Sequence, residues 1–252
     1  MKRYGWLVAL GLGAVAVFAL LTLPATLIGK QLRQFGLDAT AYQGSVWSGE
    51  ARNLGANGSS IGDLRWKISP FGLLRARLSG HLLLTRADGS LETDFEAGLS
   101  GKLRLRSAEL SLPLSMFDSL PIGVPSGWRG QISGTIEELL IVDGWPAELT
   151  GNLNLDSLTA PPPRNAQVGS FQLTMPDSFS PRKEGELSAR IVETDGPLSV
   201  DARLTLEANR NFLLEGTLAP KAGVPPGLER SLRLLGPADA AGRREFSIGG
   251  SI

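Results

Sequence analysis

The side chains that could carry out chemistry are few in this sequence. His81 is the single histidine among 252 residues, and there is no cysteine. A thiolate zinc site, an iron–sulfur cluster, a disulfide or a Ser–His–Asp triad cannot be assembled from such a set in the ordinary way. His81 shares its parity with Arg77 and Ser79 in an alternating segment. We therefore expect a solvated strand residue here rather than a general base.

Carboxylates alone can still hydrolyse glycosides, a reaction that needs two suitably spaced acids. Two acidic pairs stand out, Glu137 with Glu138 and Glu184 with Glu186, and a solvated position is the simpler interpretation of both. The glycines of Gly11–Gly13 lie inside an apolar run, where they cannot form a phosphate-binding loop. We expect no catalytic, cofactor-binding or metal-binding residue, no cofactor and no enzymatic activity.

The overall composition excludes further classes of protein. Lys and Arg total 25, as do Asp and Glu, so the chain lacks the positive excess that a nucleic-acid-binding protein needs. Hydrophobic residues make up 42% of the chain, which argues against disorder. The absence of cysteine is compatible with export to an oxidising compartment.

An uncharged run at the N-terminus predicts a membrane anchor. Residues 6–23 contain no charged side chain, with Lys2 and Arg3 before them and two further bases shortly after them. About 20 apolar residues span a bilayer as a helix. We predict a transmembrane anchor over residues 6–28, with a cytoplasmic tail formed by residues 1–5.

The orientation and retention of this anchor rest on its flanks. The bases before the run favour an N-terminus in the cytoplasm, which would place the body in the periplasm of a single-pass inner-membrane protein. A cleaved signal peptide is the main alternative, and a buried soluble helix is another. The nearest cleavage candidate, Leu23-Pro24-Ala25, has a bulky leucine at the −3 position, so we favour retention.

The rest of the chain reads as short strands. From 198 to 208 apolar residues occupy the even positions and polar residues the odd ones, and residues 74–84 and 91–105 repeat this period of two. Turn signals such as Asp88-Gly89 and Thr194–Pro197 separate the runs. This pattern predicts an all-β protein with antiparallel meander sheets and little helix besides the anchor.

The organisation of this β body has one candidate junction. Pro161–Pro163 divides it into a first half over residues 42–160 and a second half over residues 164–252, although one continuous domain is also possible. A short helix is predicted at Leu228–Leu235, between a proline and a glycine. Further strands are predicted near residues 64–68, 131–136, 139–142, 148–155 and 246–252.

The charges on two neighbouring strands suggest a register. If the chain reverses around residues 98–101, three acids face three bases, an arrangement that adds roughly a few tenths of a kcal/mol per pair. The expected pairs are Glu96 with Lys102, Asp94 with Arg104, and Glu92 with Arg106. Equally, these charges could simply solvate the outer face. Beyond Leu105 the apolar parity slips, which predicts a bulge or a change of partner.

Three motifs carry a resemblance to a known family. They combine turn glycines with strand tryptophans. The motifs are Gly44–Gly49 (GSVWSG) with Leu64–Pro70 (LRWKISP), Gly144-Trp145-Pro146 leading into Leu149–Leu153, and Leu235–Asp239 with Gly242-Arg243 before a final strand. With the N-terminal run and the length, the chain resembles the type II secretion system protein N family. Where that family tends to have two acids before the last Gly-Arg, this chain has Asp239-Ala240-Ala241.

The resemblance implies an accessory inner-membrane component of the machine that exports folded proteins across the outer membrane. Other inner-membrane components of that machine would be its partners, with the secretin as a further candidate. The alternative is an anchored β groove in lipid or lipopolysaccharide transport, as in AsmA-like proteins. Such a conduit should leave its apolar groove uncovered, whereas a scaffold should fill it with its own side chains.

Overall fold

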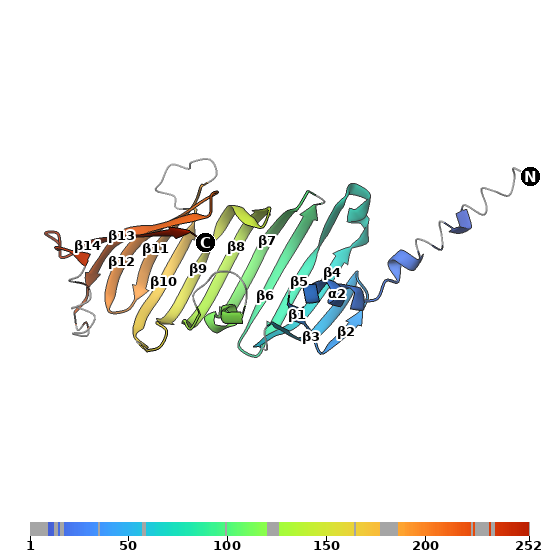
Figure 1. The fold of residues 1–252 in the computed structure, drawn as a ribbon, viewed down its shortest axis with the longest axis horizontal. Coiled ribbons are helices and arrows are strands. Elements are labelled where there is room, and N and C mark those ends of the chain that lie inside the picture. Colours follow the sequence, from blue (N-terminus) through green and yellow to red (C-terminus); the bar gives the residue numbers. More distant parts are fainter. Residues whose placement is uncertain are drawn as a thin grey trace, which may run out of the picture.

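The computed structural model shows one antiparallel sheet of 14 strands, drawn out into a long ribbon (Figure 1). Both β1 and β2 pair with β3, and from β3 onward each strand pairs with its neighbour in the chain, so the sheet is an antiparallel meander that ends at β14. The structure describes residues 10–12, 15, 18–34, 36–56, 59–98, 100–119, 126–163, 165–176, 186–222, 224, 232 and 235–251. The predicted antiparallel β architecture is confirmed.

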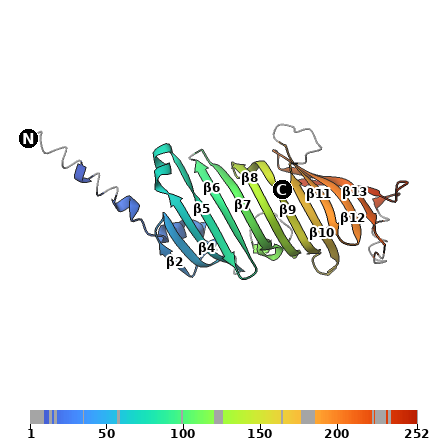
Figure 2. The same cartoon turned by 180° about the vertical axis from the view of Figure 1, so that it is seen from behind.

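Most elements follow one another with short connections, whereas longer segments precede β8, β11 and β14. In chain order they are α2 (Thr26–Gln34), β1 (Leu37–Asp38), β2 (Ala41–Gly44), β3 (Ser48–Ala56), β4 (Ser59–Ser69), the 3-10 helix η1 (Pro70–Arg75), β5 (Arg77–Arg86), β6 (Gly89–Gly98), β7 (Lys102–Pro113), the 3-10 helix η2 (Leu114–Ser119), β8 (Arg129–Val142), β9 (Trp145–Thr159), β10 (Gln167–Met175), β11 (Glu186–Asp195), β12 (Leu198–Glu207), β13 (Asn211–Pro220) and β14 (Arg244–Ser251). Figures 1 and 2 place α2 and β1–β3 at one end of the ribbon and β12–β14 at the other. The alternating runs at 91–105 and 198–208 fall on β6, the start of β7 and β12. The strand predicted at 74–84 begins only at Arg77, because residues 70–75 form η1.

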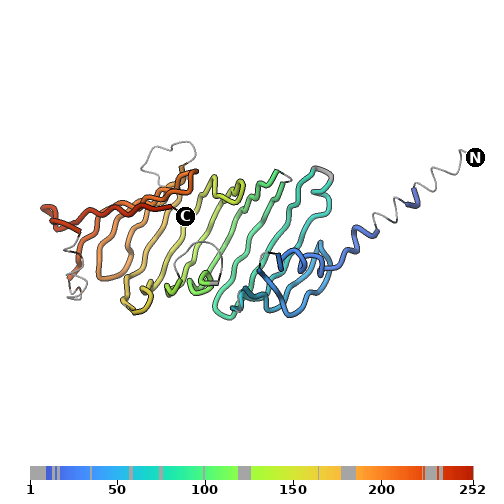
Figure 3. The backbone as a smooth tube through the Cα atoms, viewed as in Figure 1, coloured from blue at the N-terminus to red at the C-terminus, as the bar shows by residue number. Residues whose placement is uncertain are grey.

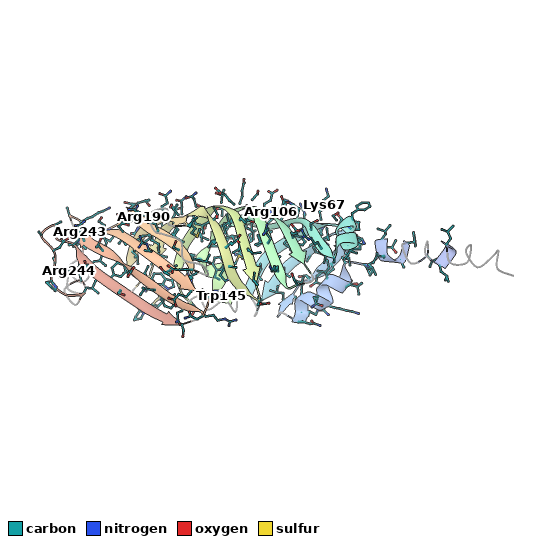
Figure 4. The ribbon with its side chains drawn as sticks, turned by 90° about the horizontal axis from the view of Figure 1, so that it is seen from above. Lys67, Arg106, Trp145, Arg190, Arg243 and Arg244 are labelled. Atoms are coloured by element: carbon teal, nitrogen blue, oxygen red, sulfur yellow. The ribbon has the colours of Figure 1, made fainter. Side chains whose placement is uncertain are left out.

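The alternation gives the sheet two chemically different sides. In β12, Leu198 and Ala202 are buried whereas Asp201 is exposed, because successive side chains point to opposite faces. The register carries this division across the sheet. We call the side with Ile61, Trp66, Leu84, Leu153 and Ala202 the apolar face, and the side with Lys67, Arg106 and Arg190 the polar face. Figure 4 shows the last three side chains projecting from the same side of the ribbon.

The apolar face is covered differently at its two ends. In the N-terminal half, Leu32 of α2, Leu37 of β1 and Met116 of η2 pack against buried residues of β3–β7. In the C-terminal half the sheet curls, so that Leu204 of β12 packs into the cluster around Leu153 of β9. The tube in Figure 3 shows the last strands turning away from the direction of the earlier ones. The core is therefore built from several small clusters along the ribbon.

The pairing of β6 with β7 corrects one prediction. The expected register is wrong by two residues. Opposite one another are Glu96 and Arg104, Asp94 and Arg106, and, beyond a register shift, Glu92 and Glu109. A shift of two keeps every side chain on its face, so the hydrophobic pattern cannot distinguish the two registers. The predicted parity slip after Leu105 is confirmed as a bulge.

Several predictions fall partly outside the described part of the chain. Within the described residues, no helix is both long and apolar enough to cross a membrane. Residues 1–9, 13–14 and 16–17 of the predicted tail and anchor lie outside that part, as does most of the helix predicted at 228–235. Strands β9 and β10 pair with each other across the proline segment between them. The anchor and the two-half division stay predictions.

Candidate functional site

The turn between β2 and β3 holds the end of the N-terminal apolar segment against the sheet. The Ala25 N–H donates to the Gly44 carbonyl at 3.1 Å, and the Val46 N–H donates to the Leu23 carbonyl at 2.9 Å. Pro24 and the residue after Gly44 form an isolated antiparallel bridge. The backbone that directly follows the apolar segment is therefore hydrogen-bonded to the β2–β3 turn.

Two tryptophans complete this connection. The indole Nε1 of Trp47 donates to the Leu20 carbonyl at 2.8 Å. The indole Nε1 of Trp66, on β4, lies 3.1 Å from the carbonyl oxygens of both Ser45 and Val46. Trp66 is only 4% exposed, so it fixes the turn from the buried side. We call residues 44–48 together with Trp66 the N-terminal clamp.

The glycines at either end of the turn are required by its geometry. Gly44 has φ +88°, and a Cβ there would collide with the Ser48 carbonyl oxygen. At Gly49, a Cβ would lie 2.6 Å from the Gln43 carbonyl oxygen and 2.6 Å from Cζ2 of Trp66. Side chains cannot be accommodated at such distances without movement of the turn. The first motif is thus explained by the clamp.

Helix α2 continues the clamp onto the apolar face. Gly29 is buried, and a Cβ there would lie 2.7 Å from the Tyr42 ring, so glycine lets the helix lie directly on that ring. The Tyr42 hydroxyl is buried without a hydrogen-bond partner among the described residues. Burial raises the pKa of this hydroxyl. Ala25 and Ala51, both almost fully buried, fill the space beside the helix.

The polar face carries ion pairs that run across the strands. Glu50 of β3 pairs with Arg52 at 2.6 Å and with Arg65 of β4 at 3.3 Å. The hydrogen bond from Arg52 is the main reason that the pKa of Glu50 is lowered. Further along, Glu96 of β6 lies 2.8 Å from Arg77 and 3.9 Å from Arg106. These pairs orient long side chains over neighbouring strands.

His81 takes part in the same network. Its Nε2 lies 3.1 Å from the Glu92 carboxylate and its Nδ1 lies 3.0 Å from the Asp94 carboxylate. The imidazole is 40% exposed on β5. No cluster of three or more side chains suited to hold a metal ion occurs in the part of the chain that the structure describes. The contacts describe a surface histidine held between two acids of the next strand.

The acidic pairs do not form a two-acid site in the described structure. Glu138 pairs with Arg104 at 3.2 Å, and its neighbour Glu137 is exposed. Glu186 begins β11, whereas Glu184 lies outside the described residues. The absence of catalytic residues stays a prediction.

Shallow hollows mark the polar face. Two of them, of about 520 and 560 Å³, lie over β4–β7 and β2–β5 and share Lys67 and His81. A third, of about 830 Å³, lies over β11–β14 and contains Arg190, Glu215 and Glu245. Each of the three is lined by both acids and bases, so each offers charges of both signs to a complementary partner.

The other two motifs also occupy junctions of the fold. The guanidinium carbon of Arg210, in the β12–β13 turn, lies 5.8 Å from the ring centroid of Trp145 at the start of β9. This cation–π contact joins two turns that are distant in the sheet order. Before β14, Asp239 accepts hydrogen bonds from the N–H groups of Ala241 and Arg243. Sequence reasoning singled out both motifs but assigned them no role. The partner of Trp145 is remote in the chain, whereas Asp239 bonds within its own turn.

Comparisons with known proteins identify the family of the chain. The family model of "Type II secretion system (T2SS), protein N" matches residues 36–247. A type II secretion system protein N of Aeromonas hydrophila is 28% identical over the full length of both chains. One from Vibrio cholerae serotype O1 is 25% identical over 86% of each chain. No solved structure matches the chain. The chain belongs to the type II secretion system protein N family and is a component of that system.

Proposed function

We propose that this protein is an accessory inner-membrane component of the type II secretion system that holds a long β sheet in the periplasm and acts through protein–protein contact. The N-terminal clamp is the observation that carries this proposal. Backbone hydrogen bonds join Leu23 and Ala25 to the β2–β3 turn, and the indole N–H of Trp47 donates a hydrogen bond to the Leu20 carbonyl. A sheet attached in this way has a set position at the end of the predicted anchor, as a scaffold requires.

The polar face supplies the surface for contact. Its charged side chains are held by ion pairs within a strand, at 2.6 Å between Glu50 and Arg52, and across strands, at 3.3 Å between Glu50 and Arg65 and at 2.8 Å between Arg190 and Asp201. Each exposed pair adds little to stability. Patterned charges instead favour specificity and rapid association with a complementary partner. We propose other inner-membrane secretion components as those partners, with the secretin as a further candidate.

Lipid transport is the competing function, and the cover on the apolar face argues against it. A conduit needs a continuous apolar groove, but Leu32, Leu37 and Met116 pack onto the N-terminal half of that face. In the C-terminal half, Leu204 fills the curl of the sheet against Leu153. This filling by the protein's own side chains supports the scaffold.

Topology and function can be tested separately. Alkaline phosphatase fused after Ile252 should be active, and the protein should stay in the membrane after carbonate washing. An inactive fusion, or a mature protein that begins near Ala25, would contradict the proposed anchoring. Deleting the gene should slow the release of exported proteins while outer-membrane lipid composition stays normal. Normal secretion with altered lipid composition would instead favour the conduit.

The contact surface can be mapped in the same cells. A photoactivatable residue placed at Lys67, Arg106 or Arg190 on the polar face should crosslink to other components of the secretion system. The same residue at Phe71, which is 77% exposed on η1, provides a comparison outside the polar face. Equal crosslinking at all four positions would refute the polar face as the specific contact surface.

A further inference from the structure

A partly enclosed cavity of about 200 Å³ lies on the apolar face in the N-terminal half. Its walls come from five strands that are spread over the first part of the chain. They include Leu37 of β1, Ile61 of β4, Leu84 of β5, and Leu91 and Thr93 of β6. Leu84 and Ile61 are each 5% exposed, so these walls belong to the buried core. The scaffold described above leaves this space unused.

The cavity offers no polar group to a ligand. Thr93 is its one polar residue, and the Thr93 hydroxyl lies 3.1 Å from the Asp94 carbonyl oxygen and 3.3 Å from the Arg106 carbonyl oxygen, as their hydrogen-bond donor. All the other lining residues are leucine or isoleucine. Water is not held in such a space, because it needs two or more polar partners. A peptide is excluded as well, since its backbone N–H and C=O groups would be left unsatisfied.

The size of the cavity selects among apolar ligands. An engineered cavity of about 150 Å³ lined by Leu, Ile and Phe stays dry and binds benzene. The cavity of about 200 Å³ found here is somewhat larger. It can take the end of an alkyl chain but not a whole lipid, so the polar part of such a molecule would remain outside.

The position of the cavity indicates which molecule supplies the acyl chain. Leu32 of α2 packs against the cluster that forms its walls, and α2 begins at Thr26, directly after the clamped end of the apolar segment. We infer that the cavity holds the end of an acyl chain from an inner-membrane phospholipid. This inference rests on the anchoring in the proposed function, which places the cavity close to the bilayer. The bound chain would complete the core beneath α2 and tie the sheet to the membrane at a second point.

The test uses the full chain in lipid nanodiscs. The discs contain phosphatidylglycerol and a phosphatidylcholine that carries a diazirine near the end of one acyl chain. After irradiation, digestion and mass spectrometry, we expect adducts in β1 and β3–β6 at the cavity walls as well as in residues 6–28. Leu84→Trp fills the cavity and should reduce the wall adducts at least tenfold. The milder Leu91→Phe should reduce them in part, should Leu84→Trp fail to fold.

The controls separate the two proposals. Leu214→Trp adds the same side chain to the apolar face of β13, far from the cavity, and should leave the wall adducts unchanged. Adducts in residues 6–28 without adducts at the walls would overturn the acyl site and leave the anchored scaffold standing. Absence of adducts from both regions would overturn the anchoring on which the inference rests. Wall adducts that persist in both Leu84→Trp and Leu91→Phe would place the acyl chain elsewhere and also overturn it.

Discussion

The geometry of the clamp allows a quantitative prediction for one methyl group added beside it. In Gly49→Ala, the added Cβ would lie 2.6 Å from the Gln43 carbonyl oxygen, 2.6 Å from Trp66 Cζ2 and 2.9 Å from the Ser45 carbonyl oxygen. Two of these atoms belong to the backbone, so a rotamer change cannot relieve the contacts. The turn itself must move away from Trp66, and the indole hydrogen bonds to the turn would lengthen.

The expected loss of stability follows from the cost of overpacking a buried site. Such insertions cost about 1–3 kcal/mol. For a chain of this size each kcal/mol lowers Tm by about 2–4 °C, so Gly49→Ala should melt roughly 2–12 °C below the parent protein. Gly249→Ala is the matched control, because its Cβ would meet its nearest atoms, Phe212 O and Leu213 Cδ1, at 3.5 and 3.7 Å. Alanine restricts the unfolded chain more than glycine does, so this variant should be neutral or slightly more stable.

Thermal unfolding of the full chain in detergent, followed by tryptophan fluorescence, provides the assay. Trp66 is 4% exposed, so movement of the turn should also shift the emission of folded Gly49→Ala to longer wavelength. Limited proteolysis near Ala25 should become faster, since the clamp protects that backbone. If both alanine variants melt with the parent protein and show its emission, the claim that glycine is required at Gly49 is refuted.

Three further predictions concern charge and burial. Leu204→Asp places an unpaired charge in the cluster around β9, and should cost several kcal/mol in a urea titration, whereas Leu213→Asp, on the opposite face of the neighbouring strand, should cost little. His81→Ala should leave export of the system's substrates unchanged, because the side chain is 40% exposed and contributes little to the core. Hydrogen bonds lower the folded-state pKa values of Glu50 and Asp118, so their contribution is present at neutral pH and is lost as pH falls through these lowered pKa values. Tm measured against pH should therefore fall at the acid end.

Each of these three has a contrary outcome. Equal urea midpoints for the two aspartate variants would mean that the apolar face is not a core. Loss of export in His81→Ala, with normal abundance of the protein and unchanged crosslinking from Lys67, would reopen an enzymatic role. A Glu50→Gln variant should have a lower Tm at neutral pH, and its Tm should fall less steeply at acid pH. An unchanged profile of Tm against pH would mean that this carboxylate does not contribute to the acid sensitivity.

The strands themselves were predictable from the sequence because their pattern is local. Apolar side chains at even positions from Leu198 onward mark one buried face, and β12 spans Leu198–Glu207. The Asp88-Gly89 turn signal falls where β5 gives way to β6. Burial with a period of two is a property of a single strand, so it can be read without knowledge of the neighbours. The same reasoning located the bulge in β7, where the parity changes.

Only the tertiary structure decided how the strands meet and where the ends are fixed. The β6–β7 register differs from the expected one by two residues. The hydrophobic pattern does not distinguish these registers, because a shift of two leaves every side chain on the same face. Thr205 lies on the polar parity yet is 9% exposed, so alternation alone does not give its burial. The clamp brings Trp66 to Ser45 and Trp47 to Leu20 across 21 and 27 residues. Local alternation sets which face a side chain takes, whereas such contacts depend on twist, curl and chain reversal, which arise only when all the strands pack together.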